Sequence, residues 1–123
     1  MAKLKQVVYG SSFQLYLYMD KYKNGNARVW LIDVETNEPF AEISKYCPDV
    51  LCENMVCLDT ECCDWAEDFI QKYKLGYSRG YKTINGIEYP LYMINKAVAV
   101  PYMNEYLEML KQFKKTVQIF RFQ

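Results

Sequence analysis

Five cysteines are the most evident candidates for site chemistry in this chain of 123 residues, because thiolates bind zinc and act as nucleophiles. They are Cys47, Cys52, Cys57, Cys62 and Cys63. A zinc site uses two short-spaced pairs that are separated along the chain, whereas these cysteines recur every five residues and then stand adjacent. We therefore expect small buried apolar residues, with no metal and no cofactor. A zinc or thiol-redox protein centred on residues 47–63 stays an alternative.

The chain contains no histidine, which removes the commonest general base, the commonest transition-metal ligand and every imidazole-based triad. Its five glycines stand apart at turn-like positions, so it has no phosphate loop, dinucleotide fingerprint or nucleophile elbow. We therefore expect a protein that is not an enzyme. Twelve tyrosines supply amphipathic contact area of the kind that suits protein recognition.

Acidic residues are concentrated in one segment, although the chain has 15 basic and 15 acidic side chains. Between Asp33 and Asp68 there are eleven acids and one base, Lys45, which gives that segment a net charge of minus ten. An acidic surface attracts basic partners and accelerates association in a salt-dependent way. The acids that border the irregular part of this segment are the predicted partner-binding residues: Glu53, Asp59, Glu61, Asp64 and Asp68.

Two further clusters of side chains suggest a binding function, one for a metal ion and one for nucleic acid. Asp33, Glu35, Glu38 and Glu42 could gather oxygen ligands around Mg²⁺, but four acids around a surface turn are commoner than a metal site. The other cluster interleaves cations with aromatic rings, a pattern that suits phosphate neutralisation and base stacking. Its members give the alternative of a nucleic-acid-binding accessory protein: Lys72, Lys74, Tyr77, Arg79, Tyr81 and Lys82.

Alternating apolar residues predict strands in the first third of the chain. Residues 12–20 alternate with the period of a half-buried strand, and Asn24-Gly25 predicts a type I′ hairpin turn. Residues 27–34 form the returning strand and residues 40–46 a third, more polar one, so residues 12–46 predict a meander. Residues 47–54 predict a loop, and the segment that follows, MVCLD, predicts a short strand.

The period changes to that of a helix after residue 59. A helix is expected over about 60–75, with Asp59 or Thr60 as N-cap and Gly76 after its end. Its buried stripe consists of Cys62, Trp65, Ala66, Phe69, Ile70 and Tyr73.

A second hairpin over about 77–94 turns at Asn85-Gly86, and Pro90 places its second strand at an edge or beside a bulge. Pro101 can open a final helix. The buried stripe of that helix consists of Met103, Tyr106, Leu107, Leu110 and Phe113. The tail over 116–123 adds a strand or forms an exposed apolar end.

These elements predict the α+β class: an antiparallel β-meander plus a second β-hairpin packed against two amphipathic helices, in a single domain over residues 1–123. No apolar run approaches the roughly 18 residues of a membrane-spanning helix, and residues 1–10 lack the apolar region of a secretory signal. We expect a cytoplasmic protein with no membrane partner.

The chain resembles an uncharacterised family of small proteins carried by phages, plasmids and conjugative elements of gut bacteria. The resemblance rests on residues 22–27 (YKNGNA), 31–33 (LID) and 38–41 (EPFA), and it spans about residues 12–93. It implies a protein of a mobile genetic element that acts by stoichiometric binding. It also implies a host protein as the partner, such as a CRISPR effector or another defence protein, which an anti-CRISPR-like inhibitor would block through the acidic surface.

Overall fold

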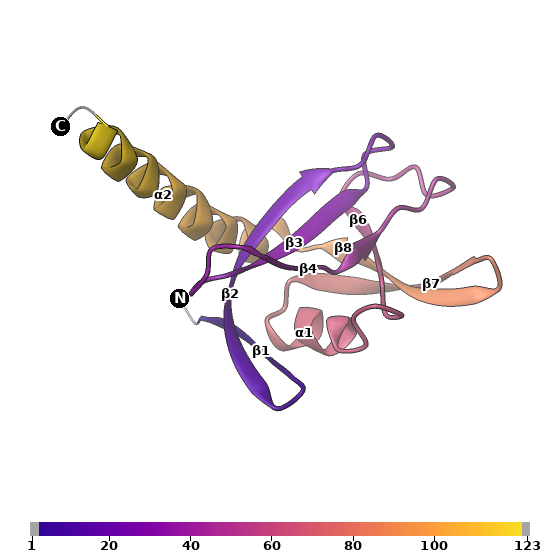
Figure 1. Cartoon of the computed structure of the whole chain (residues 1–123). Coiled ribbons are helices and arrows are strands. Elements are labelled where there is room, and N and C mark those ends of the chain that lie inside the picture. The colour runs from indigo at the N-terminus through magenta and orange to yellow at the C-terminus, as the bar shows by residue number, and fades with distance from the viewer. Residues whose placement is uncertain (1–2, 122–123) are drawn as a thin grey trace.

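A computed structural model describes residues 3–121, which form two antiparallel sheets and two helices (Figure 1). The first sheet has the strand order β1 (Leu4–Val8), β2 (Ser11–Lys21), β3 (Ala27–Asp33) and β4 (Pro39–Glu42). The second has the order β5 (Ser44–Lys45), β6 (Met55–Leu58), β8 (Ile87–Ile94) and β7 (Gly76–Ile84). The helices are α1 (Ala66–Lys72) and α2 (Lys96–Arg121). The predicted α+β class, with its meander and second hairpin, is confirmed.

The meander contains a strand that the sequence analysis did not predict. Strand β1 pairs with β2 from Leu4 opposite Leu15 to Val8 opposite Ser11. The outward backbone groups of Lys5 on this edge strand are bonded to Tyr73, whose hydroxyl accepts from the Lys5 N–H (2.8 Å) and donates to the Lys5 carbonyl (3.2 Å). The edge of the first sheet is therefore capped at this point by a side chain that follows α1.

The turn between β2 and β3 is not of type I′, because Gly25 has a positive φ (89°) and Asn24 does not. The Gly25 N–H donates to the Tyr22 carbonyl (2.9 Å), and the Tyr22 N–H donates to the Asn26 carbonyl (2.9 Å). This is a three-residue loop with glycine in the left-handed position. The second hairpin does have the predicted type I′ turn, with φ of 51° at Asn85 and 82° at Gly86.

The predicted third strand is divided at Ile43, where the chain passes from one sheet to the other. The Ile43 N–H donates to the Val29 carbonyl of the first sheet (3.0 Å), and the Ile43 carbonyl accepts from the Asp59 N–H (2.9 Å), directly after β6 of the second. The Ile43 side chain is fully buried. One apolar residue therefore joins the two sheets through its backbone and its side chain.

Helix α1 is shorter than predicted, because residues 60–65 form turns rather than helix. Its N-cap is Trp65, without a side-chain cap, so neither Asp59 nor Thr60 caps it. At its end the Leu75 N–H donates to the Ile70 carbonyl (2.9 Å) and the Lys74 N–H to the Gln71 carbonyl (3.1 Å). This is a Schellman motif with Lys74 (φ 56°) in the position predicted for Gly76.

The predicted stripe of α1 is buried at Ala66, Phe69 and Ile70, while Cys62 is exposed and Cys63 is buried in its place. Strand β8 lies between β6 and β7, but β6 pairs with it only from Leu91 to Met93. Pro90 pairs with Tyr81 of β7 beside the predicted bulge.

Helix α2 begins at Lys96, five residues before the predicted start, and includes Pro101. Its first half packs against β2, and its far end extends away from both sheets (Figure 1). Tyr102 is buried, whereas Phe113 of the predicted stripe is 56% exposed. Residues 116–121 continue the helix rather than adding a strand, and residues 122–123 of the predicted tail lie outside the described residues.

One apolar core connects the two helices with strands β1 to β4, β6 and β8. It joins the first sheet, the second sheet and both helices through residues such as Leu31, Val56, Ile70 and Ala99, each of which is fully buried. A smaller cluster of Cys47, Cys57 and Tyr89 lies within the second sheet and its loop. The turn between β6 and α1 is anchored to the main core through the buried side chain of Cys63.

Candidate functional site

Residues 59–68, which we call the acidic turn, connect β6 to the first residues of α1. The Asp59 carbonyl accepts from the Cys63 N–H (2.9 Å), and the Asp59 carboxylate accepts from the Cys62 N–H (3.3 Å). The carboxylate predicted to cap a helix instead stabilises this local turn. Glu61, Asp64 and Asp68 are exposed along it.

Two buried tyrosines of β8 hold carboxylates of the acidic turn in place. The Tyr89 hydroxyl donates to Glu61 (2.8 Å), and the Tyr92 hydroxyl donates to Glu67 (2.8 Å) while it accepts from Gln71 (2.7 Å). Burial, followed by the Glu61 carboxylate, raises the pKa of Tyr89 to about 12. Burial and then Glu67 likewise raise the pKa of Tyr92. Both hydroxyls therefore stay protonated and fix the two acids without neutralising their charge.

Glu67 was not among the predicted site residues. Nothing in the local sequence distinguishes it from its neighbours, because its role depends on Tyr92, which is twenty-five residues later and reaches α1 only through sheet pairing.

The carboxylates of the acidic turn have no cationic partner among the described residues. Among residues 3–114, whose side chains are described, the ion pairs join Lys3 to Glu105, Lys21 to Glu53, Arg28 to Glu42, and Lys82 to Asp49. A cation near the turn, Lys45, lies 5.2 Å from the centre of the Tyr89 ring. The turn therefore presents carboxylates that have no direct ion pair, with Lys45 as a nearby positive charge.

Glu53 does not belong to this group. It lies at the opposite end of β6, whose four residues alone span about 13 Å. Its carboxylate is 3.5 Å from the Lys21 ammonium group, and its Cγ borders the turn at Gly25. The structure thus places Asp59, Glu61 and Asp64 on one short turn and Asp68 on the adjoining helix, but separates Glu53 from them.

An apolar hollow of about 400 Å³ adjoins the acidic turn. It is lined by Val8, Phe40, Ala41, Glu42, Cys62, Cys63 and Trp65. Trp65 packs against Phe40 (6.1 Å between ring centres) and Phe69 (5.9 Å), which fixes the wall of the hollow on the side of the turn. Exposed charge therefore lies next to apolar surface contributed by β1, β4 and the turn itself.

The predicted cation–tyrosine patch over 72–82 is divided by the bulge in β7. Because directly opposed residues share a face of a sheet, Tyr77 lies on the face of Met93, whereas Tyr81 lies on the face of Pro90 and Tyr92. The remaining members are dispersed: Lys72 ends α1, Lys74 follows it, Arg79 lies at the bulge and Lys82 is 4.0 Å from Asp49. The two tyrosines cannot form one stacking surface.

The cysteines divide into three that are buried, Cys47, Cys57 and Cys63, and two that are exposed, Cys52 and Cys62. Burial raises the pKa of Cys57 and of Cys63 to about 11, and the hydrogen bond with Asp59 raises that of Cys62. These thiols are held in the protonated, poorly nucleophilic form. Within residues 3–121, no three cysteine or carboxylate side chains are grouped to hold a metal ion.

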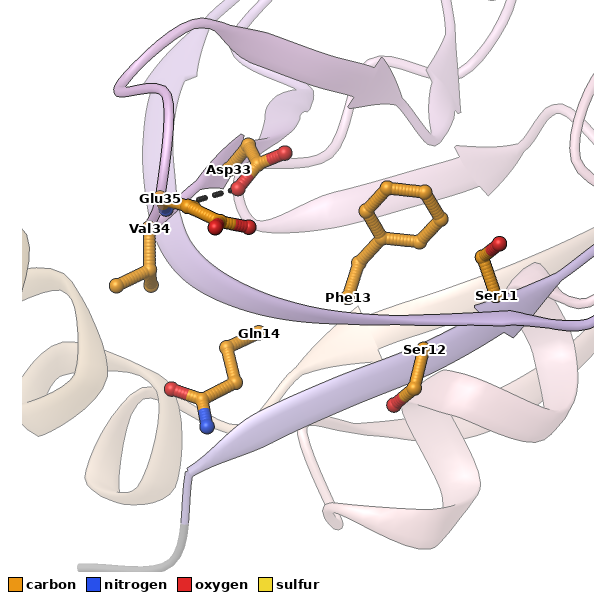
Figure 2. A pocket seen from close by; sticks show the side chains of 7 residues that line it. All are labelled: Ser11, Ser12, Phe13, Gln14, Asp33, Val34 and Glu35. Carbon is orange, nitrogen blue, oxygen red and sulfur yellow. Dashed lines mark hydrogen bonds between the residues drawn. The ribbon is translucent and has the colours of Figure 1, made fainter.

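A larger hollow of about 630 Å³ lies where β2 passes the end of β3, beside two acids of the Mg²⁺ cluster considered above. Figure 2 shows that its polar side chains do not converge, since Gln14 and Ser12 point away from Phe13 and Ser11. The Asp33 carboxylate is used locally, because it accepts from the Glu35 N–H (2.8 Å). This hollow does not assemble a catalytic group.

Comparisons of the chain with protein-family models, with curated proteins and with solved structures gave no match. The resemblance to proteins of mobile elements therefore stays a prediction. Neither helix in the described part of the chain has the length and apolar character to cross a membrane.

Proposed function

We propose that this protein acts without catalysis, by binding the basic surface of a partner protein through the acidic turn and the apolar hollow beside it. The observation that carries the proposal is the state of the carboxylates: Glu61 and Glu67 are fixed by buried tyrosine hydroxyls, and Asp64 and Asp68 are exposed without a cation. Groups held in place before binding lose little conformational entropy when a partner docks.

The hollow beside the acidic turn offers apolar surface, which contributes affinity that charge alone does not provide. Electrostatic complementarity accelerates association and selects partners, while affinity comes largely from side chains that fill apolar pockets at the centre of an interface. The walls formed by Phe40 and Trp65 fit an apolar side chain of the partner, flanked by lysines or arginines that meet Asp64 and Asp68.

The resemblance to proteins of mobile elements supports a more specific proposal. The partner is a host defence protein with a basic nucleic-acid channel, such as a CRISPR effector, and the acidic turn competes for that channel in the manner of a phosphate backbone. The protein is then an anti-CRISPR-like inhibitor that works in a stoichiometric complex.

Charge changes on the turn test the proposal. A variant with Glu61→Gln, Asp64→Lys and Asp68→Lys should lose the partner in affinity capture followed by mass spectrometry, and its thermal midpoint should stay within a few degrees of the parent. The control variant Glu35→Lys, Glu38→Lys changes exposed acids outside the turn and should keep the partner. Retention of the same partner by the acidic-turn variant would contradict the proposal.

A further inference from the structure

A third hollow, of about 380 Å³, lies at the β2–β3 hairpin and gathers cations with aromatic rings. It is lined by Lys21, Tyr22, Lys23, Arg28 and Tyr46, and we call it the cation–tyrosine hollow. The Tyr22 and Tyr46 rings meet edge to face with 5.3 Å between their centres. This combination was predicted at residues 72–82 and occurs instead on a different hairpin.

Two asparagines bond the β2–β3 hairpin, one wall of the hollow, to the loop at residues 47–52, which follows Tyr46 on the other wall. The Asn24 side chain donates to the carbonyls of Cys47 (2.8 Å) and Val50 (3.2 Å). The Asn26 side chain is buried and donates to Val50 (2.8 Å) and Cys52 (3.0 Å). The hairpin tip that carries the lysines is thereby fixed against the loop that follows Tyr46, so the hollow exists before any ligand arrives.

Glu42 orients the arginine of the hollow. Its carboxylate accepts from the Tyr22 hydroxyl and from Nε of Arg28 (3.2 Å). The guanidinium carbon lies 4.7 Å from the centre of the Trp30 ring and 5.7 Å from that of Tyr22. No described residue accepts a hydrogen bond from the terminal nitrogens of Arg28, so their N–H groups are available to a ligand.

The lysines of the hollow can also reach a ligand. The Lys23 ammonium group lies 5.6 Å from the centre of the Tyr46 ring and has no carboxylate partner among the described residues. Lys21 pairs with Glu53 at 3.5 Å, but both side chains are at least half exposed, and such pairs exchange readily.

We propose that the cation–tyrosine hollow binds a nucleotide with an unpaired base, either free or within a single strand. A planar guanidinium with free N–H groups and a neighbouring ammonium suit a phosphate, while half-buried tyrosine rings suit a base that is not stacked in a duplex. This site is distinct from the acidic turn and does not depend on the proposed protein partner.

Fluorescence polarisation with labelled 12-mers of single-stranded RNA and DNA tests the inference. Binding should weaken steeply between 50 and 250 mM NaCl, because phosphate contacts release counterions. Lys23→Gln should weaken binding about five-fold and lower the salt slope by about one, and Tyr46→Leu should weaken it about ten-fold. Unlabelled mononucleotide, inorganic phosphate and oligomer are then added to displace the labelled 12-mer. Displacement by the mononucleotide but not by phosphate shows that a single nucleotide with its base is sufficient for binding.

Lys72→Gln is the matched control, because Lys72 is an exposed lysine that lies 5.3 Å from the centre of a tyrosine ring outside the hollow. It should leave the affinity within two-fold of the parent. Equal losses in Lys23→Gln and Lys72→Gln, a preference for duplex over single strand, or no binding at 50 mM NaCl would each overturn the proposal. Thermal midpoints near that of the parent show that the variants are folded.

Discussion

Asn26 shows how much a single buried side chain contributes to this protein. Its amide nitrogen donates to two loop carbonyls, and its amide oxygen accepts from Asn24 (3.0 Å), so every polar atom of a buried group is satisfied. The sequence around it, NGN, predicts a turn but gives no sign of what the second asparagine binds, because its acceptors come from residues 50 and 52.

Replacing Asn26 with alanine should lower the free energy of unfolding by about 1–2 kcal/mol, since two partly buried carbonyls lose their donor. Asn104→Ala is the control, because Asn104 is exposed on α2 and alanine favours helix. Urea unfolding measures both. Equal small effects in the two variants would show that the Asn26 hydrogen bonds contribute little.

The buried thiols give the stability a dependence on alkaline pH. Burial raises the pKa of Cys57 and of Cys63 from 9.0 to about 11, so the unfolded chain loses these protons first. The contribution of these two thiols to the free energy of unfolding should be constant below about pH 9 and fall as the pH rises to about 11, on the order of 1–2 kcal/mol for each thiol. Cys57→Ala should flatten part of this fall in urea titrations, and an unchanged slope would contradict the assignment.

At the scale of elements, α1 ends in a conformation that suits glycine better than its own residue. Lys74 adopts φ of 56° in the Schellman motif, and a Cβ is strained in that region. Lys74→Gly should therefore raise the free energy of unfolding by about 0.5–1 kcal/mol. Lys72→Gly, at the last helical residue, should instead lower it by about 0.5 kcal/mol. A loss of stability in both variants would show that the strain at Lys74 is negligible.

Periodicity predicted most elements correctly, because the two faces of β2 and the stripe of α1 differ sharply in polarity. It failed where tertiary contacts decide the outcome. Strand β1 is short and exists through pairing with β2, and the chain from 39 to 45 divides because Ile43 bonds to both sheets. The turn at Asn24 departs from type I′ because its side chain is bound to the loop at 47–50.

At the scale of the whole molecule, two candidate binding surfaces of opposite charge lie on either side of Glu42. This residue lines the hollow beside the acidic turn and also bonds to Tyr22 and Arg28 of the cation–tyrosine hollow. Charge counting predicted the acidic segment as a site. It could not predict the cation–tyrosine hollow, because Arg28 and Tyr46 are distant in the sequence and come together only when Asn24 and Asn26 bind the loop that follows Tyr46.

Helix α2 divides into a packed part and a part that extends from the body (Figure 1). Tyr102→Ala should lower the free energy of unfolding by about 3 kcal/mol, because its ring is 8% exposed and contributes to the core. Phe113→Ala, at a residue that is 56% exposed, should change it by less than about 0.5 kcal/mol. Comparable losses in thermal melts would mean that the far half of α2 packs as tightly as the near half.

The hydroxyl of Tyr73 occupies the place that another strand would take beside Lys5. An open strand edge is a template on which further chains can add, and Val7 on this edge is 59% exposed. The Tyr73 hydroxyl therefore blocks this part of the β1 edge from pairing with a further strand. We expect Tyr73→Phe to lower the solubility of concentrated samples while the thermal midpoint stays near that of the parent.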